Sequence, residues 1–248
     1  MIWVIPCFNE AQRLEPGRVE ALVSRPDTHA LLVDDGSSDE TLAVLKGLAY
    51  RHPGKVSVLP LEKNQGKAEA VRRGLVQAGQ GAGMIGYADA DFSTPPYELH
   101  RLTDVMDARD VGVVIGSRVG LSGAKIDRKP MRHYLGRLFG TAASLLLGAA
   151  IYDTQCGAKL FRVTPLLTAS LAEPFGSRWI FDVELLGRML IGTAGLPGLP
   201  AHQLVEVPLL EWRDVGGSKL GLKSMIQVPW QLLKTRSRLQ ALRSARDR

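Results

Sequence analysis

The sequence predicts an α/β fold with a doubly wound, mostly parallel central sheet, in a single domain with amphipathic C-terminal helices. Short apolar runs rich in β-branched residues alternate, along the first 118 residues, with segments whose apolar positions recur at helical spacing. Such strand, helix, strand repetition builds parallel strands with helices on both faces of the sheet. The length of 248 residues, with 45% hydrophobic and 23% charged residues, suits a soluble chain of one such domain or two small ones.

The elements follow one another in a regular order. The strands are expected at 1–6, 30–35, 55–61, 83–91 and 111–118, and the helices at 17–24, 40–51, 67–78 and 96–107. After residue 118 the alternation stops, and a basic loop leads into an amphipathic helix expected over 131–150. Because no linker or repeat separates the parts, we assign residues 1–220 to one domain and 221–248 to a basic amphipathic extension.

The net charge of +6 is concentrated in two segments. Residues 118–137 and residues 231–248 each contain six Lys or Arg against one Asp, a net charge of +5, which leaves the remainder near −4. Two local basic surfaces are therefore expected, and they suit phosphates or anionic lipid head groups. Because no recognised nucleic-acid motif is present, we expect no nucleic-acid partner.

Cysteine usage and apolar segments indicate the compartment. Cys7 and Cys156 are too few and too distant for a disulfide framework, which favours a reducing cytoplasm. Met1 is followed at once by an apolar run without a basic n-region, so no secretory signal is expected. The uncharged apolar stretch 138–152 is about five residues shorter than the roughly 20 needed to span a bilayer. It belongs in a core or on a membrane surface.

Polar side chains follow the ends of the expected strands. In doubly wound sheets, ligands bind beyond the carboxyl ends of the strands, where the strand order reverses. The residues at these ends are Asn9, Glu10, Asp34, Asp35, Asp89, Asp91 and Arg118. They are expected to collect at one rim of the sheet.

Two acidic motifs and one basic motif at this rim each have a functional and an ordinary interpretation. Asp89 and Asp91, in ADAD, are either ligands of Mg²⁺ or Mn²⁺ or part of an acidic turn. Asp35, in VDDGSSDET, either accepts a hydrogen bond from a nucleobase or belongs to a strand-to-helix turn. Lys67 stands near a helix N-terminus, where anions are favoured, or on a solvated helix.

Eight motifs in order resemble a known family. They are IPCFNE, VDDGSSDET, NQGKAEAVRRG, DADFSTPP, GSR, YDTQCGAKLF, RWIFDVELL and WRDVGGSKL. Together they resemble the family 2 glycosyltransferases of the Rossmann-like GT-A fold, and most closely those that act on dolichyl or polyprenyl phosphate. The resemblance runs from Ile5 to about Leu220. DTQCG and WIFDVELL are more similar to the glucosyl than to the mannosyl branch, which favours UDP-glucose over GDP-mannose. Ala158, where that branch carries an aromatic residue, departs from the pattern, as does the absence of a transmembrane anchor.

The resemblance implies an inverting, metal-dependent transfer of a hexose from a nucleotide sugar to a polyprenyl or dolichyl phosphate, at the cytoplasmic face of a membrane. It implies that Mg²⁺ or Mn²⁺ is held by Asp89 and Asp91, although Asp89 could serve the nucleotide instead. The residues implied for the donor nucleotide are Pro6, Phe8, Glu10, Asp35, Lys67, Asp89 and Arg213. Arg118, Arg128 and Arg132 are implied for the acceptor phosphate, and Asp153, Arg118 and Lys219 for catalysis.

Several roles stay open at this level. Asp153 could orient the acceptor, act as a base or cap a helix, and Arg128 and Arg132 could belong to a solvated loop. Asp182 could face the acceptor. Lys219 follows a Gly-Gly pair that the resemblance assigns to a loop closing on the donor diphosphate. Transfer of mannose from GDP-mannose, a catalytically silent nucleotide-sugar-binding module and a nucleotidyltransferase are the alternatives.

Overall fold

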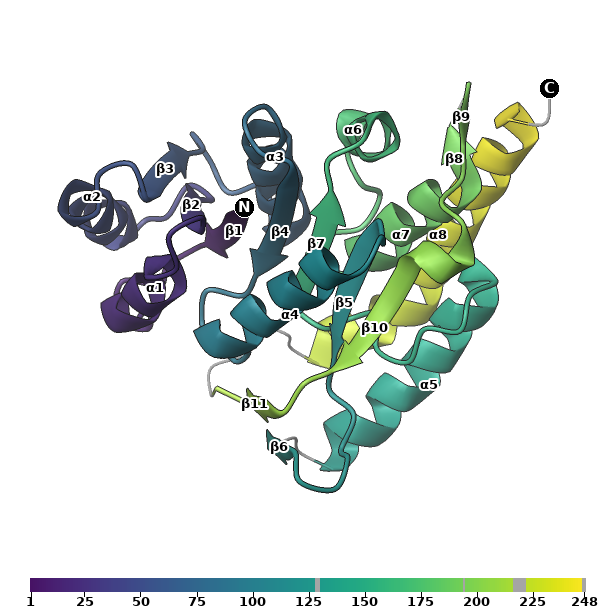
Figure 1. Ribbon diagram of the computed structural model, residues 1–248. Helices are drawn as coiled ribbons and strands as arrows, with labels where there is room; N and C mark the ends of the chain where they lie inside the picture. Colours follow the sequence, from purple (N-terminus) through teal and green to yellow (C-terminus); the bar gives the residue numbers. More distant parts are fainter. Residues whose placement is uncertain (128–129, 194, 216–221, 247–248) are drawn as a thin grey trace.

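The computed structural model describes residues 1–127, 130–193, 195–215 and 222–246, with the backbone alone at 130–135 and 222–228. In this described part, seven strands form the central sheet in the order β10-β5-β7-β4-β1-β2-β3 (Figure 1). Their bounds are β1 Ile2–Cys7, β2 His29–Asp34, β3 Val56–Pro60, β4 Met84–Ala88, β5 Val113–Ser117, β7 Ala158–Arg162 and β10 Leu204–Pro208. The predicted fold class is confirmed.

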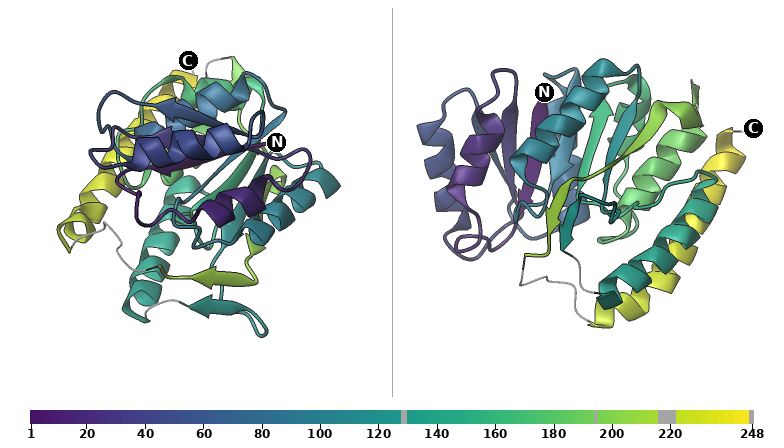
Figure 2. Two further views of the ribbon diagram at one scale, coloured as in Figure 1. Left: turned by 90° about the vertical axis from the view of Figure 1, so that its left-hand side faces the viewer. Right: turned by 60° about the horizontal axis from the view of Figure 1, so that its bottom comes forward.

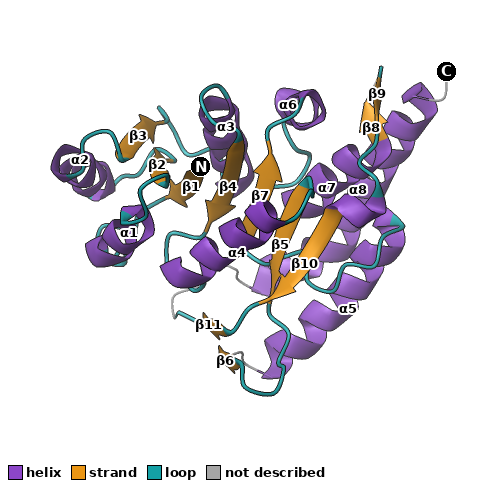
Figure 3. Cartoon of the chain, viewed as in Figure 1, coloured by secondary structure: helices purple, strands orange, loops and turns teal. Residues whose placement is uncertain are grey.

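Helices cover both faces of the sheet, as Figure 3 shows. They are α1 Pro16–Val23, α2 Thr41–Arg51, α3 Lys67–Gly79, α4 Pro96–Ala108, α5 Pro130–Leu147, α6 Pro165–Ala172, α7 Phe181–Ile191 and α8 Leu222–Arg246. One apolar core lies between the sheet and α1, α2 and α4, and the other lies on the opposite face, against α3, α6 and α7 with contributions from α5 and α8. Prolines in the first turns of α1, α4 and α6 favour these helix starts, because the ring fixes a helical φ where no N–H is needed.

The strand order explains where a ligand could bind. The chain runs from β1 outwards to β2 and β3, and then returns to place β4 on the other side of β1. The loops after β1 and β4 therefore leave in opposite directions and open a crevice between them. Gly74 brings α3 close to this junction, because a Cβ there would stand 2.3 Å from Cγ1 of Val4.

β7 inserts between β4 and β5 and is antiparallel to both. This strand was not among those predicted, because its sequence AKLFR contains two cations in five residues and resembles no apolar run. Lys159 stands opposite Tyr87 of β4 and Ile115 of β5, in the middle of the sheet. The charged side chain of Lys159 is thereby placed in the core that faces α3, α6 and α7.

Two-stranded pairs complete the fold: β6 Lys125–Asp127 with β11 Glu211–Arg213, and β8 Gly192–Thr193 with β9 Leu196–Pro197. A short 3₁₀ turn, Ala201–Gln203, precedes β10. The pair β6–β11 lies beyond the ends of β5 and β10, on the side of the sheet where α5 begins (Figure 1).

α8 packs against α7 through specific contacts. Leu239 is buried against Gly187, and Arg238 forms an ion pair with the buried Glu184 at 3.0 Å. The predicted boundary at 220/221 falls in the undescribed residues 216–221 and stays a prediction. Among the described residues, no helix combines the length and the apolar character needed to cross a bilayer.

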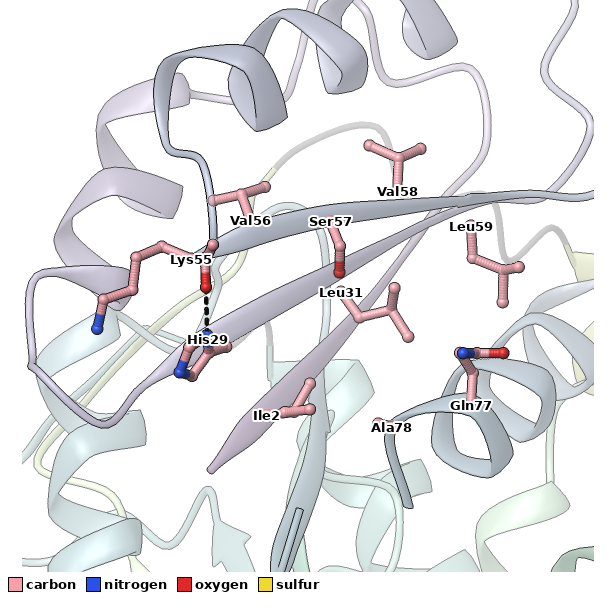
Figure 4. Close-up of a pocket in the computed structure, with 11 residues that line it drawn as sticks. Ile2, His29, Leu31, Lys55, Val56, Ser57, Val58, Leu59, Gln77 and Ala78 are labelled. Atoms are coloured by element: carbon pink, nitrogen blue, oxygen red, sulfur yellow. Dashed lines mark hydrogen bonds between the residues drawn. The ribbon is translucent and has the colours of Figure 1, made fainter. Parts of the chain in front are cut away.

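A groove of about 470 Å³ lies between α3 and the edge of the sheet formed by β2 and β3 (Figure 4). Its lining includes Ile2, His29 and Val56, the first residues of β1, β2 and β3. It therefore lies towards the amino ends of these strands, away from the rim where the sequence places the polar motifs.

Candidate active site

The carboxylate pair lies directly beyond β4. One oxygen of Asp91 accepts a hydrogen bond from the backbone N–H of Ser93 at 3.0 Å, and the other is 3.8 Å from Nη2 of Arg13. Asp89 accepts a hydrogen bond from Nζ of Lys67. The turn is tight, since Phe92 adopts a positive φ of 47° that few non-glycine residues tolerate. Both acids are thus fixed at the crevice between β1 and β4.

The electrostatics of this pair favour a cation. Burial and the neighbouring charge of Asp89 raise the pKa of the Asp91 carboxyl. A divalent ion would relieve that repulsion, and oxygen ligands are those that Mg²⁺ and Mn²⁺ prefer. In the described parts of the chain, no group of three or more His, Cys, Asp or Glu could hold a metal.

Lys67 begins α3 and belongs to the same cluster. Desolvation lowers its pKa, but the negative charges of Asp89 and Asp182 outweigh this effect, and the pKa is raised. The ammonium is therefore charged at neutral pH, at the N-terminus of a helix. Both features favour a bound phosphate.

Asp35 follows β2 and is buried against the loop before α3. Its carboxylate accepts hydrogen bonds from Nδ2 of Asn64 at 3.0 Å and from the backbone N–H groups of Gln65 and Gly66, both at 2.8 Å. Burial raises the pKa of Asp35, and the two backbone hydrogen bonds partly offset the rise. The side chain thus shapes the turn on which Lys67 stands, next to the position predicted for the nucleoside.

The loop after β1 is tied to the loop after β2. The N–H of Asn9, at a φ of 50°, donates to Oγ of Ser37 at 3.0 Å, and the N–H of Glu10 donates to Oγ1 of Thr41 at 2.8 Å. Glu10 is buried and lies 3.4 Å from Nη1 of Arg13. Pro6 and Phe8, also predicted for the nucleotide, are half-buried at this end of β1. The structure thus brings most of the predicted donor residues to one rim.

Arg118 and Asp153 form a closed pair beyond β5. Nε and Nη2 of Arg118 donate to the two oxygens of Asp153 at 2.7 and 2.8 Å, and the guanidinium lies 5.2 Å from the centre of the Trp212 ring. Desolvation lowers the pKa of Arg118, but the charge of Asp153 outweighs it and raises the pKa. Glu206 accepts the backbone N–H of Asp153 at 2.7 Å. This geometry favours Asp153 as the residue that orients Arg118.

A buried polar cluster lies beneath the two pairs. Asp182 accepts hydrogen bonds from the hydroxyl of Tyr87, from Nζ of Lys159 at 2.9 Å and from Nε2 of Gln155 at 3.3 Å. Burial raises the pKa of Asp182 to about 8 and lowers that of Lys159 to about 8. The carboxylate of Asp182 is enclosed by these donors, and the interpretation that it faces the acceptor stays a prediction. The lysine within the otherwise apolar end of YDTQCGAKLF was the available signal for this cluster.

The remaining predicted residues lie at the margin. The backbone N–H of Arg213 donates to the carbonyl of Ser93 at 3.0 Å, which places β11 beside the carboxylate turn, but its side chain is 71% exposed. Arg132 lies in the first turn of α5, where the backbone alone is described. Arg128 and Lys219 lie outside the described residues. Their assigned roles stay predictions.

This fold, with an acidic pair at its switch point, is the fold of the GT-A glycosyltransferases. More narrowly, the chain belongs to glycosyl transferase family 2, whose model matches residues 2–168. A dolichyl-phosphate beta-glucosyltransferase of Drosophila melanogaster is 36% identical over 238 residues, which cover 88% of this chain and 68% of the relative. A polyprenol monophosphomannose synthase of Mycolicibacterium smegmatis is 31% identical over 222 residues, covering 88% and 79%.

The fold is also that of a solved enzyme. Glucosyl-3-phosphoglycerate synthase from Mycobacterium tuberculosis, crystallised with Mn²⁺, uridine diphosphate and glucosyl-3-phosphoglycerate, superposes with a TM-score of 0.68 at 18% identity, over 95% of this chain and 79% of that one. The predicted family and enzyme class are confirmed.

Proposed function

We propose that the protein transfers glucose from UDP-glucose, with inversion, to the phosphate of a polyprenyl or dolichyl phosphate. The observation that carries the proposal is the pairing of two sites on one rim: Asp89, Asp91 and Lys67 beyond β4, and the Arg118–Asp153 pair beyond β5. Asp89 is close enough to contribute to the raised pKa of Arg118. The dolichyl-phosphate beta-glucosyltransferases among the relatives support glucose as the sugar and dolichyl phosphate as the acceptor.

The reaction needs no strong base. A phosphate oxygen of the acceptor forms a bond to C1 of glucose while the bond from C1 to the diphosphate breaks, and UDP leaves with the electron pair. The attacking oxygen is already ionised near neutral pH, so alignment is the main requirement. Both carboxylate oxygens of Asp153 accept hydrogen bonds from Arg118. This agrees with a reaction in which Asp153 positions Arg118 rather than acting as a base.

The chain's own residues would divide the work. Lys67 stabilises the charge that develops on the leaving diphosphate, and Arg118 offers a planar guanidinium to the acceptor phosphate. Asp89 and Asp91 would hold Mg²⁺ or Mn²⁺. When bound, that ion supplies further stabilisation of the departing diphosphate.

A membrane-facing surface would present the lipid acceptor. α5 and α8 run side by side in Figures 1 and 2, and they line a groove of about 660 Å³. Exposed apolar side chains gather on the two helices: Leu138, Leu145, Trp230 and Leu233 are 71%, 79%, 72% and 57% exposed. Arg236 and Arg243 line the same groove. An apolar surface edged by cations suits the interface of an anionic leaflet, which we place at the cytoplasmic face.

A mannosyl donor is the second candidate, because the polyprenol monophosphomannose synthase relative covers as much of this chain as the Drosophila enzyme does. A silent binding module would retain nucleotide affinity without turnover. The discriminating experiment offers purified protein UDP-glucose, GDP-mannose and UDP-N-acetylglucosamine in turn, with Mn²⁺ and a short polyprenyl phosphate. Transfer from UDP-glucose at a rate at least ten times that of the other donors is expected. A preference for GDP-mannose, or no transfer at all, would reject the proposal.

A further inference from the structure

The segment from Asp153 to Gly157 touches both halves of the site. Asp153, at one end, holds Arg118 on the acceptor side. Gly157, at the other end, packs directly on the donor side, because a Cβ at this residue would stand 2.1 Å from Oδ2 of Asp89. A segment of five consecutive residues therefore connects Arg118, which is expected to bind the acceptor, with Asp89, which is expected to bind the metal.

The buried polar cluster of Tyr87, Gln155, Lys159 and Asp182 holds this segment in place through hydrogen bonds. Nζ of Lys159 donates to the carbonyl of Cys156 at 2.6 Å as well as to Asp182, and Gln155 donates to the other oxygen of Asp182. Asp182 also accepts the hydroxyl of Tyr87, which stands two residues before Asp89 on β4. One carboxylate on α7 thus joins β4, β7 and the segment between them.

We propose that Lys159 and Asp182 are positioning residues, which fix the 153–157 segment against β4 and so set the alignment of Arg118 relative to Asp89. The inference rests on the proposed function for its kinetic consequence. Lys159 is fully buried and Asp182 nearly so, although the charge of Asp182 also acts on Lys67. A displacement of about 1 Å between reacting groups can cost about 100-fold in rate, so a structural link of this kind has a kinetic signature.

The alternative is that the pair only stabilises the fold. A matched control exists on the same helix: Glu184 is also buried, pairs with Arg188 and Arg238, and accepts the N–H of Gly176. Its hydrogen bonds and ion pairs within the described part of the chain involve Gly176, Arg188 and Arg238 rather than residues 153–157. Glu184→Gln removes a buried charge from α7 and leaves the segment's own contacts in place. It therefore reports what destabilisation alone does.

The kinetic test compares four variants with UDP-glucose, Mn²⁺ and a short polyprenyl phosphate. Asp182→Ala and Lys159→Met are expected to lower kcat by about 10- to 100-fold while KM for UDP-glucose changes by less than about 3-fold. Asp182→Asn keeps an acceptor oxygen for Tyr87 and Lys159, and its amide group can donate to Oε1 of Gln155 in place of the bond from Nε2. This variant should retain kcat within about 5-fold. Glu184→Gln should lower the thermal unfolding midpoint without lowering kcat. The inference would be overturned if Asp182→Asn lost as much kcat as Asp182→Ala. It would also be overturned if Glu184→Gln, with a thermal unfolding midpoint similar to that of Asp182→Ala, lost as much kcat.

Amide hydrogen exchange provides a readout that does not need turnover. In Asp182→Ala, exchange of peptides covering 152–157 should accelerate at least 10-fold, with peptides from α1 and α2 unchanged and Glu184→Gln like the wild type in this segment. Unchanged exchange at 152–157 would overturn the inference even in an active enzyme. If the wild type transfers no glucose, the proposed function fails, and the exchange result still decides whether the cluster holds the segment.

Discussion

At the residue scale, the site is built from charges that compensate one another. Lys67 pairs with Asp89, Arg13 approaches Asp91, and Arg118 closes on Asp153. The exception is Asp91, because burial and the neighbouring charge of Asp89 both raise its pKa. A divalent ion bound by both carboxylates would relieve the repulsion between two acids that a tight turn holds together. The charge balance of the site is therefore expected to depend on a bound divalent ion.

Replacing Asp91 with Asn keeps the shape and removes the charge. We expect Mn²⁺-dependent transfer to fall by about 100-fold or more, because the ion loses a carboxylate ligand while the diphosphate still needs charge stabilisation. Turnover as a function of Mn²⁺ concentration provides the measurement. Asp104→Asn, an exposed acid on α4, serves as the control. An unaltered Mn²⁺ dependence in Asp91→Asn would remove the metal assignment.

Arg118→Lys tests the acceptor role without leaving Asp153 unpaired. Lysine keeps the charge but loses the planar fork that donates twice to one oxyanion group. KM for the lipid phosphate should rise about 10-fold or more, while the affinity for UDP, measured by calorimetry, stays within about 2-fold. Parallel losses in the two quantities would contradict a role confined to the acceptor.

At the scale of elements, local patterns predicted the first half of the chain well. The strands β1 to β5 and helices α1 to α4 follow apolar runs and periodicities within single segments, and parallel pairing then brings the acids after β2 and β4 to one rim. β7 escaped prediction because Lys159 interrupts its apolar pattern. The role of Asp182 escaped because its partners lie 23 to 95 residues away in the sequence. Patterns within one segment do not encode such contacts.

The exposed apolar residues of α5 and α8 are predicted to bind the surface of an anionic membrane. Removing residues 231–248 would also remove the buried Leu239 and the Arg238–Glu184 pair, so substitutions at exposed positions give the cleaner test. Changing Leu138, Leu145, Trp230 and Leu233 together to Ser should lower sedimentation with anionic liposomes by at least 5-fold, because their apolar surface no longer enters the interface. The unfolding midpoint should be unchanged. Wild-type sedimentation by this variant would rule out the surface formed by α5 and α8.

At the scale of the whole molecule, one sheet places the proposed donor site and the proposed acceptor site next to each other. The switch point between β1 and β4 presents the acids and Lys67, and β5 presents Arg118 from two strands away in the sheet, with antiparallel β7 between them. The helices α5 and α8 lie on the flank, where they can present a lipid phosphate to that rim. If the proposed lipid acceptor is correct, this arrangement would bring its phosphate to the rim from the side of α5 and α8.

The most direct test of the central claim is the structure of the product. Purified protein with UDP-glucose, Mn²⁺ and a short polyprenyl phosphate should yield UDP and a polyprenyl phosphate carrying glucose, and NMR of the anomeric proton should show the β configuration, inverted from the α donor. A product with the α configuration, or release of free glucose without a lipid-linked product, would contradict the account.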